Sequence, residues 1–192
     1  MTYLVMGVTF LVTMAAFSIH GLFRAFRLSP HEVATKGAWH QVVTSGFLHA
    51  DFGHLFFNMF TLYFFGRGVE RLLDPRSFAL IYLGSLVGGS LLTVARHRGD
   101  PSYHAVGASG AVSGILFSFI LFEPMARIHV FLIPVGIPAV LFALGYILIS
   151  VFGMKSGARG IGHDAHLGGA LAGAALTILI HPQVISRFLS RF

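Results

Sequence analysis

The sequence predicts an all-α fold: a polytopic membrane protein built as a compact bundle of six transmembrane helices, with residues 1–192 forming one domain. Two observations predict it. Of the 192 residues, 55% are hydrophobic, only 10% are charged and the mean hydropathy is +0.79, whereas soluble domains carry about 25% charged residues. The chain also contains several apolar runs, each long enough to cross a hydrocarbon layer of about 30 Å.

The six helices are predicted from apolar runs of about 17 to 25 residues bounded by charge, Gly or Pro. They occupy residues 3–22, 48–66, 77–95, 107–123, 133–153 and 164–182. We assign nearly all polar residues inside apolar sequence to the second, fourth and sixth runs, and almost none to the first and third. This division predicts an inner and an outer set of helices.

The segments around these runs have features of their own. Residues 1–23 lack the basic start of a signal peptide, so we expect a retained first helix. Residues 24–41 are amphipathic and are expected to lie at the membrane interface. The glycine-rich stretch 153–162 is typical of a mobile loop before the last helix.

Charge and composition exclude several function classes. The 13 basic and 7 acidic residues give a net charge of +6, but the basic residues are scattered between the helices without a basic, aromatic stripe. We therefore predict contacts with anionic lipid headgroups and not with nucleic acid. The chain has no Cys, which excludes disulfides, a thiol nucleophile and thiolate metal ligands. Lys and Arg are divided seven to six between the two sides of a six-span model, so charge does not determine orientation.

Two clusters of polar residues lie where apolar sequence would reach membrane depth, and such residues are costly there. His54 and Asn58 are four residues apart on one helix face, so both can donate hydrogen bonds into one cavity, or else to a neighbouring helix. Ser109, followed by Gly110, opens the fourth run, where free backbone N–H groups can stabilise an oxyanion. Small residues at this spacing, Gly110 and Gly114, also indicate close helix packing.

A third cluster opens the sixth run. Ala165, Gly169 and Gly173 form a stripe of small residues, and His166 lies about 100° round the helix from it. If the fourth helix packs on this stripe, His166 comes within hydrogen-bond reach of Ser109, as an activated serine requires. Asp164 is interpreted as a helix cap or a solvated helix end, which leaves a Ser–His dyad.

Together the three clusters supply a nucleophile, a base and oxyanion donors, the set of groups that acyl transfer needs. Ser113 shares a helix face with Ser109 but lies about 6 Å deeper at 1.5 Å per residue. Because hydrolysis needs water, Ser109 is predicted to be the nucleophile. His49, near the end of the interfacial segment, is interpreted as structural.

At these residues the sequence resembles the rhomboid family of intramembrane serine proteases. The resemblance runs from Thr44-Ser-Gly-Phe-Leu-His49 through His54 and Asn58, the Gly107-Ala-Ser-Gly110 motif, and Ala165-His166 with its following glycines. It implies that Ser109 is the nucleophile and His166 the general base, with His54, Asn58 and the Ser109 backbone N–H stabilising the oxyanion. We expect no cofactor and no metal, because the sequence has no Cys and no plausible metal-binding cluster.

The resemblance also implies a setting. Both termini would lie in the cytoplasm of a bacterium, and the active site would open to the extracytoplasmic side of the inner (cell) membrane. The fifth helix and the loop before the sixth would serve as substrate gate and cap. The partners would be single-pass transmembrane substrates, cut after a small residue near the top of the helix.

The chain departs from the family pattern in two places. Many members carry a Trp-Arg pair where this chain has His40 and Gln41, with Trp39 one place early. Members also often have an aromatic residue four positions after the nucleophile, packed on the catalytic His, and here that residue is Ser113. We therefore expect positioning of the His166 ring to depend on other residues.

Two other functions compete with proteolysis. A catalytically inactive rhomboid-like protein would bind transmembrane clients without cutting them, but the expected mark is loss of the Ser or the His, and both are present. A metal transporter is suggested by the eleven His. No acidic residue accompanies them at predicted membrane depth, which disfavours it.

Overall fold

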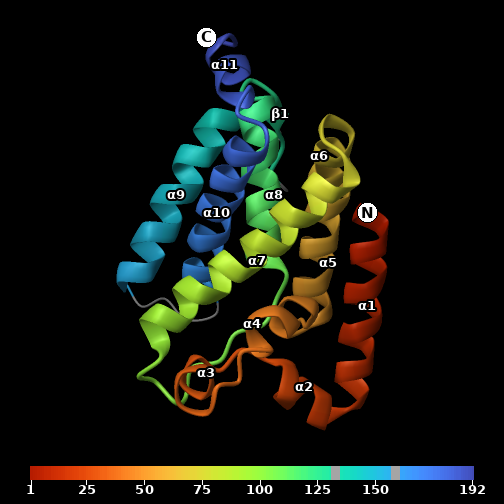
Figure 1. Cartoon of the computed structure of the whole chain (residues 1–192), viewed down its shortest axis with the longest axis vertical. Coiled ribbons are helices and arrows are strands. Elements are labelled where there is room, and N and C mark those ends of the chain that lie inside the picture. Colours follow the sequence, from red (N-terminus) through yellow and green to blue (C-terminus); the bar gives the residue numbers. More distant parts are fainter. Residues whose placement is uncertain (131–134, 157–160) are drawn as a thin grey trace.

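The computed structural model describes residues 1–130, 135–156 and 161–192, and these are mostly helical (Figure 1). One short antiparallel ribbon pairs β1 (Arg127–Ile128) with β2 (Ile137–Pro138). The helices of the described residues are α1 (Thr2–Ser18), α2 (His20–Phe26), α3 (Pro30–Lys36), α4 (Gln41–Thr44), η1 (Ser45–Phe47), α5 (Phe52–Thr61), η2 (Leu62–Gly66, a π-helix), α6 (Arg67–Leu72), α7 (Pro75–His97), α8 (Ser109–Phe122), α9 (Ala139–Ser156), α10 (His163–Ile180) and α11 (Val184–Leu189).

A helix lies at each of the six predicted runs, and α5, η2 and α6 follow one another without a break in place of the second. The first run is divided at Ile19, where α1 ends and α2 begins. Among the described residues, α7 and α9 are long and apolar enough to cross a membrane, whereas α1 and α8 are apolar but have 17 and 14 residues. The helices are confirmed, and the number of membrane crossings stays a prediction.

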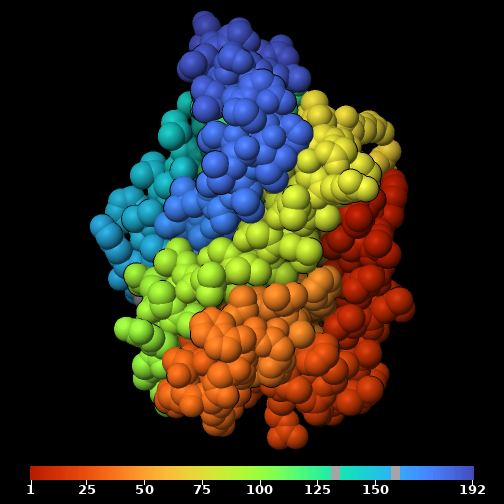
Figure 2. All heavy atoms as spheres, viewed as in Figure 1, coloured from red at the N-terminus to blue at the C-terminus, as the bar shows by residue number. Residues whose placement is uncertain are grey.

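The centre of the molecule is formed by α7, α8 and α10, and α7 lies diagonally across the bundle (Figure 1). The atoms of α7 and α10 lie side by side along their length on the face shown in Figure 2. Our assignment of the third run to an outer, nonpolar set is therefore wrong. Ser85, Ser90 and Thr93 of α7 are buried, because their small side chains, two of them bonded to the preceding helical turn, fit a close helix contact.

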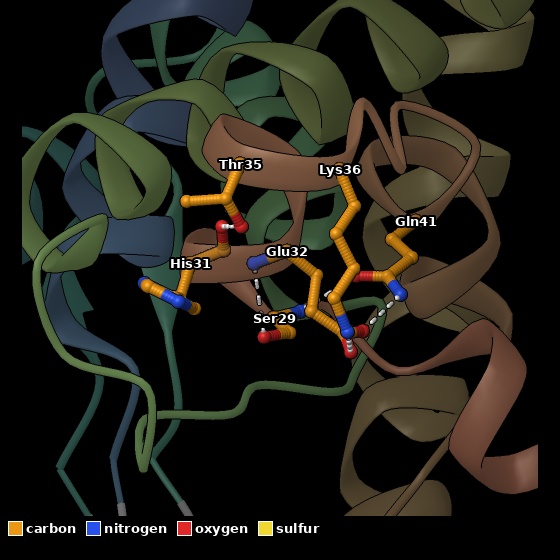
Figure 3. A network of polar contacts seen from close by, with 6 residues as sticks. All are labelled: Ser29, His31, Glu32, Thr35, Lys36 and Gln41. Carbon is orange, nitrogen blue, oxygen red and sulfur yellow. Dashed lines mark hydrogen bonds and ion pairs between the residues drawn. The ribbon is translucent and has the colours of Figure 1, made fainter.

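The predicted interfacial segment folds as the short helices α2, α3 and α4, which lie at one end of the molecule (Figure 1). Figure 3 shows the network that holds α3. The Glu32 carboxylate accepts hydrogen bonds from Lys36 at 2.9 Å and from Gln41 at 3.2 Å, and these bonds hold the pKa of Glu32 below its ordinary value. The buried Gln41 also accepts a bond from the Ser29 N–H at 2.8 Å. Gln41, one of the two departures from the family pattern, thus braces this segment.

The predicted glycine-rich loop at 153–162 lies partly outside the described residues. Its first four residues, 153–156, are still helical and complete α9. At the other side, Gly162 is the N-cap of α10. The loop prediction therefore begins four residues too early, because the apolar pattern of α9 continues through Gly153.

Candidate active site

The three polar clusters of the sequence meet in one cavity of about 1040 Å³. This is possible because α5, α8 and α10 all begin toward the end of the molecule that carries α2, α3 and α4 (Figure 1). The residues predicted to carry chemistry all line it: His54, Asn58, Ser109 and His166, together with Ser113. Their catalytic roles stay predictions, but their convergence is a property of the fold.

Ser109 is the first residue of α8, so its backbone N–H belongs to the group of four that have no partner inside the helix. The chain reaches this point through Gly107, whose φ of +128° lies in a region that L side chains rarely adopt. The Gly107 N–H donates to the Ser45 carbonyl at 3.0 Å. The turn before Ser109 is thereby fixed to the segment that leads into α5.

His49 holds the same turn from another side. Its ring is fully buried, with Nδ1 3.2 Å from the Thr13 hydroxyl and Nε2 accepting from the Ala108 N–H at 3.4 Å. His49 therefore links α1 to the residue before Ser109. These contacts agree with the structural role that was predicted for His49 from the sequence.

His54 and Asn58 lie on the cavity face of α5, whose start is capped by the Asp51 side chain accepting from the His54 N–H at 2.7 Å. The Asn58 amide donates to the His54 carbonyl at 2.9 Å, which uses one of its two hydrogens. A Cβ added at Gly107 would lie 2.6 Å from His54 Cε1 and 3.7 Å from Ser109 Oγ. The His54 ring edge and the Ser109 hydroxyl therefore border the same point.

The predicted stripe on α10 packs on α8. An added Cβ at Gly169 would meet the backbone of Gly110, and one at Gly173 would meet the backbone of Gly114. This contact brings His166 into the cavity with Ser109. No hydrogen bond joins the two side chains within the described part of the chain, and such bonds are often long in enzymes without substrate.

Ion pairs of Asp164 hold the start of α10 against the end of α7. Asp164 is buried and pairs with Arg96 Nε and with His97 Nε2, each at 2.6 Å. The prediction of a solvated helix end is therefore wrong: the basic last turn of α7 meets the first turn of α10, where an acidic residue is favoured. His97 also stacks on Tyr103, with ring centroids 3.7 Å apart. Burial, and then the Asp164 carboxylate, raise the pKa of Tyr103.

Tyr146 of α9 is the cavity residue that sequence reasoning missed. Its ring stacks on His166, with centroids 6.0 Å apart and an angle of 27° between the planes. Its hydroxyl lies 2.5 Å from the Ser113 hydroxyl. The departure at Ser113 was a signal that another residue supports His166, but no local pattern identifies which one.

Comparisons with known proteins identify the family of this chain. The model of the Rhomboid domain family matches residues 36–183. Rhomboid-like protein 12, mitochondrial, of Arabidopsis thaliana is 36% identical over 155 residues, which are 72% of this chain and 46% of that protein. Two Bacillus subtilis proteins also match: the putative rhomboid protease YdcA, 39% identical over 48% of this chain and 45% of its own length, and the rhomboid protease GluP, 29% identical over 78% and 27%. The chain thus spans less than half the length of these relatives, and the family match over most of its own length shows that it belongs to the rhomboid family.

Proposed function

We propose that this protein is an intramembrane serine endopeptidase that hydrolyses peptide bonds in or near the transmembrane helices of single-pass membrane proteins. The observation that carries the proposal is the single cavity lined by Ser109, His166, His54 and Asn58 in a chain of the rhomboid family. Family membership alone would not suffice, because some of its members are named only as rhomboid-like proteins.

In the proposed reaction the Ser109 oxygen attacks the carbonyl carbon of the scissile bond while His166 takes the hydroxyl proton. The negative charge that develops on the carbonyl oxygen is stabilised by donors from His54, Asn58 and the Ser109 backbone N–H. His166 then gives its proton to the departing amine. Water, deprotonated by the same imidazole, attacks the acyl-enzyme ester and releases the acid, which restores the Ser109 hydroxyl.

The proposed setting is a membrane, because the rhomboid family consists of integral membrane proteins. We propose six spans in one domain of residues 1–192, with the cavity opening to the extracytoplasmic side and α9 as the gate. The reported relatives come from a mitochondrion and from a bacterium. The expected bacterial cell membrane is therefore supported by the sequence resemblance and not by these comparisons.

A second candidate function is client binding without cleavage. It is favoured by one observation: no hydrogen bond joins Ser109 to His166 in the described part of the chain. A client-binding protein would retain transmembrane partners and leave them intact, and replacing Ser109 would change nothing that can be measured.

The test is incubation of the purified protein with a generic single-pass substrate, with and without a serine-directed fluorophosphonate. We expect cleavage that the fluorophosphonate blocks and that Ser109→Ala abolishes. Chelators and thiol reagents should leave the rate unchanged. Inhibition by a chelator, reversed by added zinc, would contradict the serine mechanism. If the wild-type protein and Ser109→Ala both bind the substrate and leave it uncut, the result would support client binding.

A further inference from the structure

The His166 ring is oriented by other rings. Among the described residues, no hydrogen bond reaches either of its ring nitrogens. Its ring contacts are with Tyr146 of α9, at 6.0 Å and 27°, and with His163 at 6.4 Å and 73°. A base without a hydrogen-bonded partner keeps a productive orientation only if packing fixes its rotamer. The near-parallel face of Tyr146 is the contact suited to that task.

Tyr146 is itself fixed to α8 by a short chain of hydrogen bonds. The Ser113 hydroxyl donates to the Ser109 carbonyl at 2.6 Å and lies 2.5 Å from the Tyr146 hydroxyl. A serine hydroxyl has one proton, so Tyr146 must be the donor to Ser113. The edge of Phe117, also on α8, meets the Tyr146 ring with centroids 5.5 Å apart. The orientation of Tyr146 is thus set one helical turn below the nucleophile.

We propose that Tyr146 is the positioning residue for His166, and that the Ser113–Tyr146 pair performs from two helices what one aromatic residue at position 113 would perform from α8 alone. This rests on the proposed function, in which His166 is the base. No contact between Ser113 and the His166 ring is found among the described residues, but the Ser113 hydroxyl gives Tyr146 a partner. Tyr146 contacts the base and not the reacting atoms, so its role is alignment.

The placement of this support on α9 has a consequence for the catalytic cycle. Most of α9 is only lightly packed: Ala139, Ala143 and Ser150 are its buried residues. If α9 moves aside to admit a substrate helix, Tyr146 leaves the His166 ring and the base loses its alignment. Cleavage therefore waits until α9 has returned against α8 and α10.

The first experiment removes the Tyr146 ring and compares it with a control on the same helix. In Tyr146→Leu we expect kcat to fall by about 10²-fold, the cost of misplacing a reacting group by about 1 Å, with KM little changed. Phe152→Leu is the matched control, because Phe152 is 65% exposed. A rise in KM at unchanged kcat, or the same loss in both variants, would overturn the proposal.

A spectroscopic readout makes the test independent of activity. The ring protons of His166, assigned with His166→Gln, are followed by NMR of ¹³C-histidine-labelled protein in detergent. Loss of the stacked ring in Tyr146→Leu should shift these signals, whereas Phe152→Leu should not. Unchanged signals in Tyr146→Leu would refute the stacking. If the wild-type protein neither cleaves nor reacts with fluorophosphonate, the proposed function fails, and these signals still decide whether Tyr146 orients His166.

Two further sets of variants test the Tyr146–Ser113 hydrogen bond and the rescue of a Tyr146 variant by an aromatic residue at position 113. Tyr146→Phe and Ser113→Ala both remove the Tyr146–Ser113 hydrogen bond, and Ser113→Ala also removes the bond to the Ser109 carbonyl. Each should cost no more than about tenfold in kcat, and the double variant should be no worse than Ser113→Ala alone. The rescue variant places an aromatic residue back on α8, as Ser113→Phe in the Tyr146→Ala background. Relative to Tyr146→Ala, it should recover part of kcat, and the NMR signals of the His166 ring should move part of the way back to their wild-type positions. Additive losses, or no recovery of the shift, would contradict the pairing.

Discussion

Both α9 and α10 border the cavity, but they pack against α8 through different chemistry. Between α8 and α10, backbone meets backbone, and a single methyl group added at Gly169 or Gly173 would collide with the opposite helix. Between α9 and α8 the contact is made by side chains, chiefly Tyr146 with Ser113 and Phe117. The first contact fixes the main chain at Ser109 and His166, whereas the second fixes only the orientation of one ring.

This difference suits the proposed function, in which α9 moves as a substrate gate while the residues of the site stay fixed. The α8–α10 contact is a seam of glycines, formed by Gly110, Gly114, Gly169 and Gly173. This seam cannot open without exposing backbone and losing its packing. A contact of side chains can separate and form again at the cost of a hydrogen bond and ring packing, each worth about 0.5–1.5 kcal/mol. This is the arrangement expected if Ser109 and His166, which lie beside the α8–α10 contact, are the nucleophile and base and α9 is the gate.

The largest expected effect tests whether the seam presents Ser109 as the reacting group. Removing a serine nucleophile costs about 10⁶ in kcat in a well-studied protease, so Ser109→Ala should abolish cleavage and fluorophosphonate labelling. Its melting temperature should match that of the wild type, because Ala fits the same helix start. Mass spectrometry of the labelled protein is the measurement, with Ser113→Ala as the control that loses no more than about tenfold. An adduct on Ser113 would move the nucleophile one turn deeper.

The next largest effect concerns the α5 side of the cavity. Loss of one oxyanion donor typically costs about 10²–10³ in rate, so His54→Ala and Asn58→Ala should each lower kcat toward this range, with a smaller loss where the donors share the charge. Substrate binding and the melting temperature should change little, because these donors act on charge that develops in the transition state. The measurement is kcat and KM with one substrate. If the two single variants and the double variant all cleaved at the wild-type rate, these residues would be packing elements only.

The α8–α10 contact and the packing of α9 can be compared directly by adding side-chain volume to the first and removing it from the second. Gly169→Val should lower the free energy of unfolding by about 1–3 kcal/mol or more, because the added methyl groups overlap the Gly110 backbone. Leu148→Ala on α9 should change it by less than about 0.5 kcal/mol, because this side chain is exposed. Thermal unfolding in detergent measures both. Equal losses would mean that α9 is as firmly packed as the seam.

The smallest effect is expected at the charged network of α3, the third kind of contact in the molecule. Hydrogen bonds from Lys36 and then Gln41 lower the pKa of Glu32, so the folded state binds a proton less readily than the unfolded one. The stabilisation is present above the unfolded pKa and is lost as the pH falls through the lowered value. Glu32→Gln should therefore melt slightly earlier than the wild type at pH 7, and the two should converge in acid. A constant difference at all pH values would assign the effect to shape and not to charge.

Much of this arrangement could be predicted because lipid imposes strong rules on sequence. The apolar runs predicted a helix at six places, and a helix is found at each, because backbone groups in hydrocarbon must be satisfied within the helix. The small-residue stripe of Ala165, Gly169 and Gly173 predicted a close contact with another helix, and the structure shows that α8 is that helix. The spacing placed His54 and Asn58 on one helix face, and the resemblance implied that they share a site with Ser109 and His166, as polar groups at depth must face the interior.

Sequence alone thus determined the helices, the small-residue stripe of α10 and four of the polar residues in the cavity, because each is encoded by spacing within one segment. It did not determine which helix lies at the centre: α7 carries an ordinary apolar pattern, and it lies inside because its glycines and its small polar residues fit close contacts with α8 and α10. The partners of Asp164 are Arg96 and His97, 68 and 67 positions away, and the support of His166 comes from Tyr146 on another helix. Such contacts depend on distances between separate helices, which only the packed structure sets.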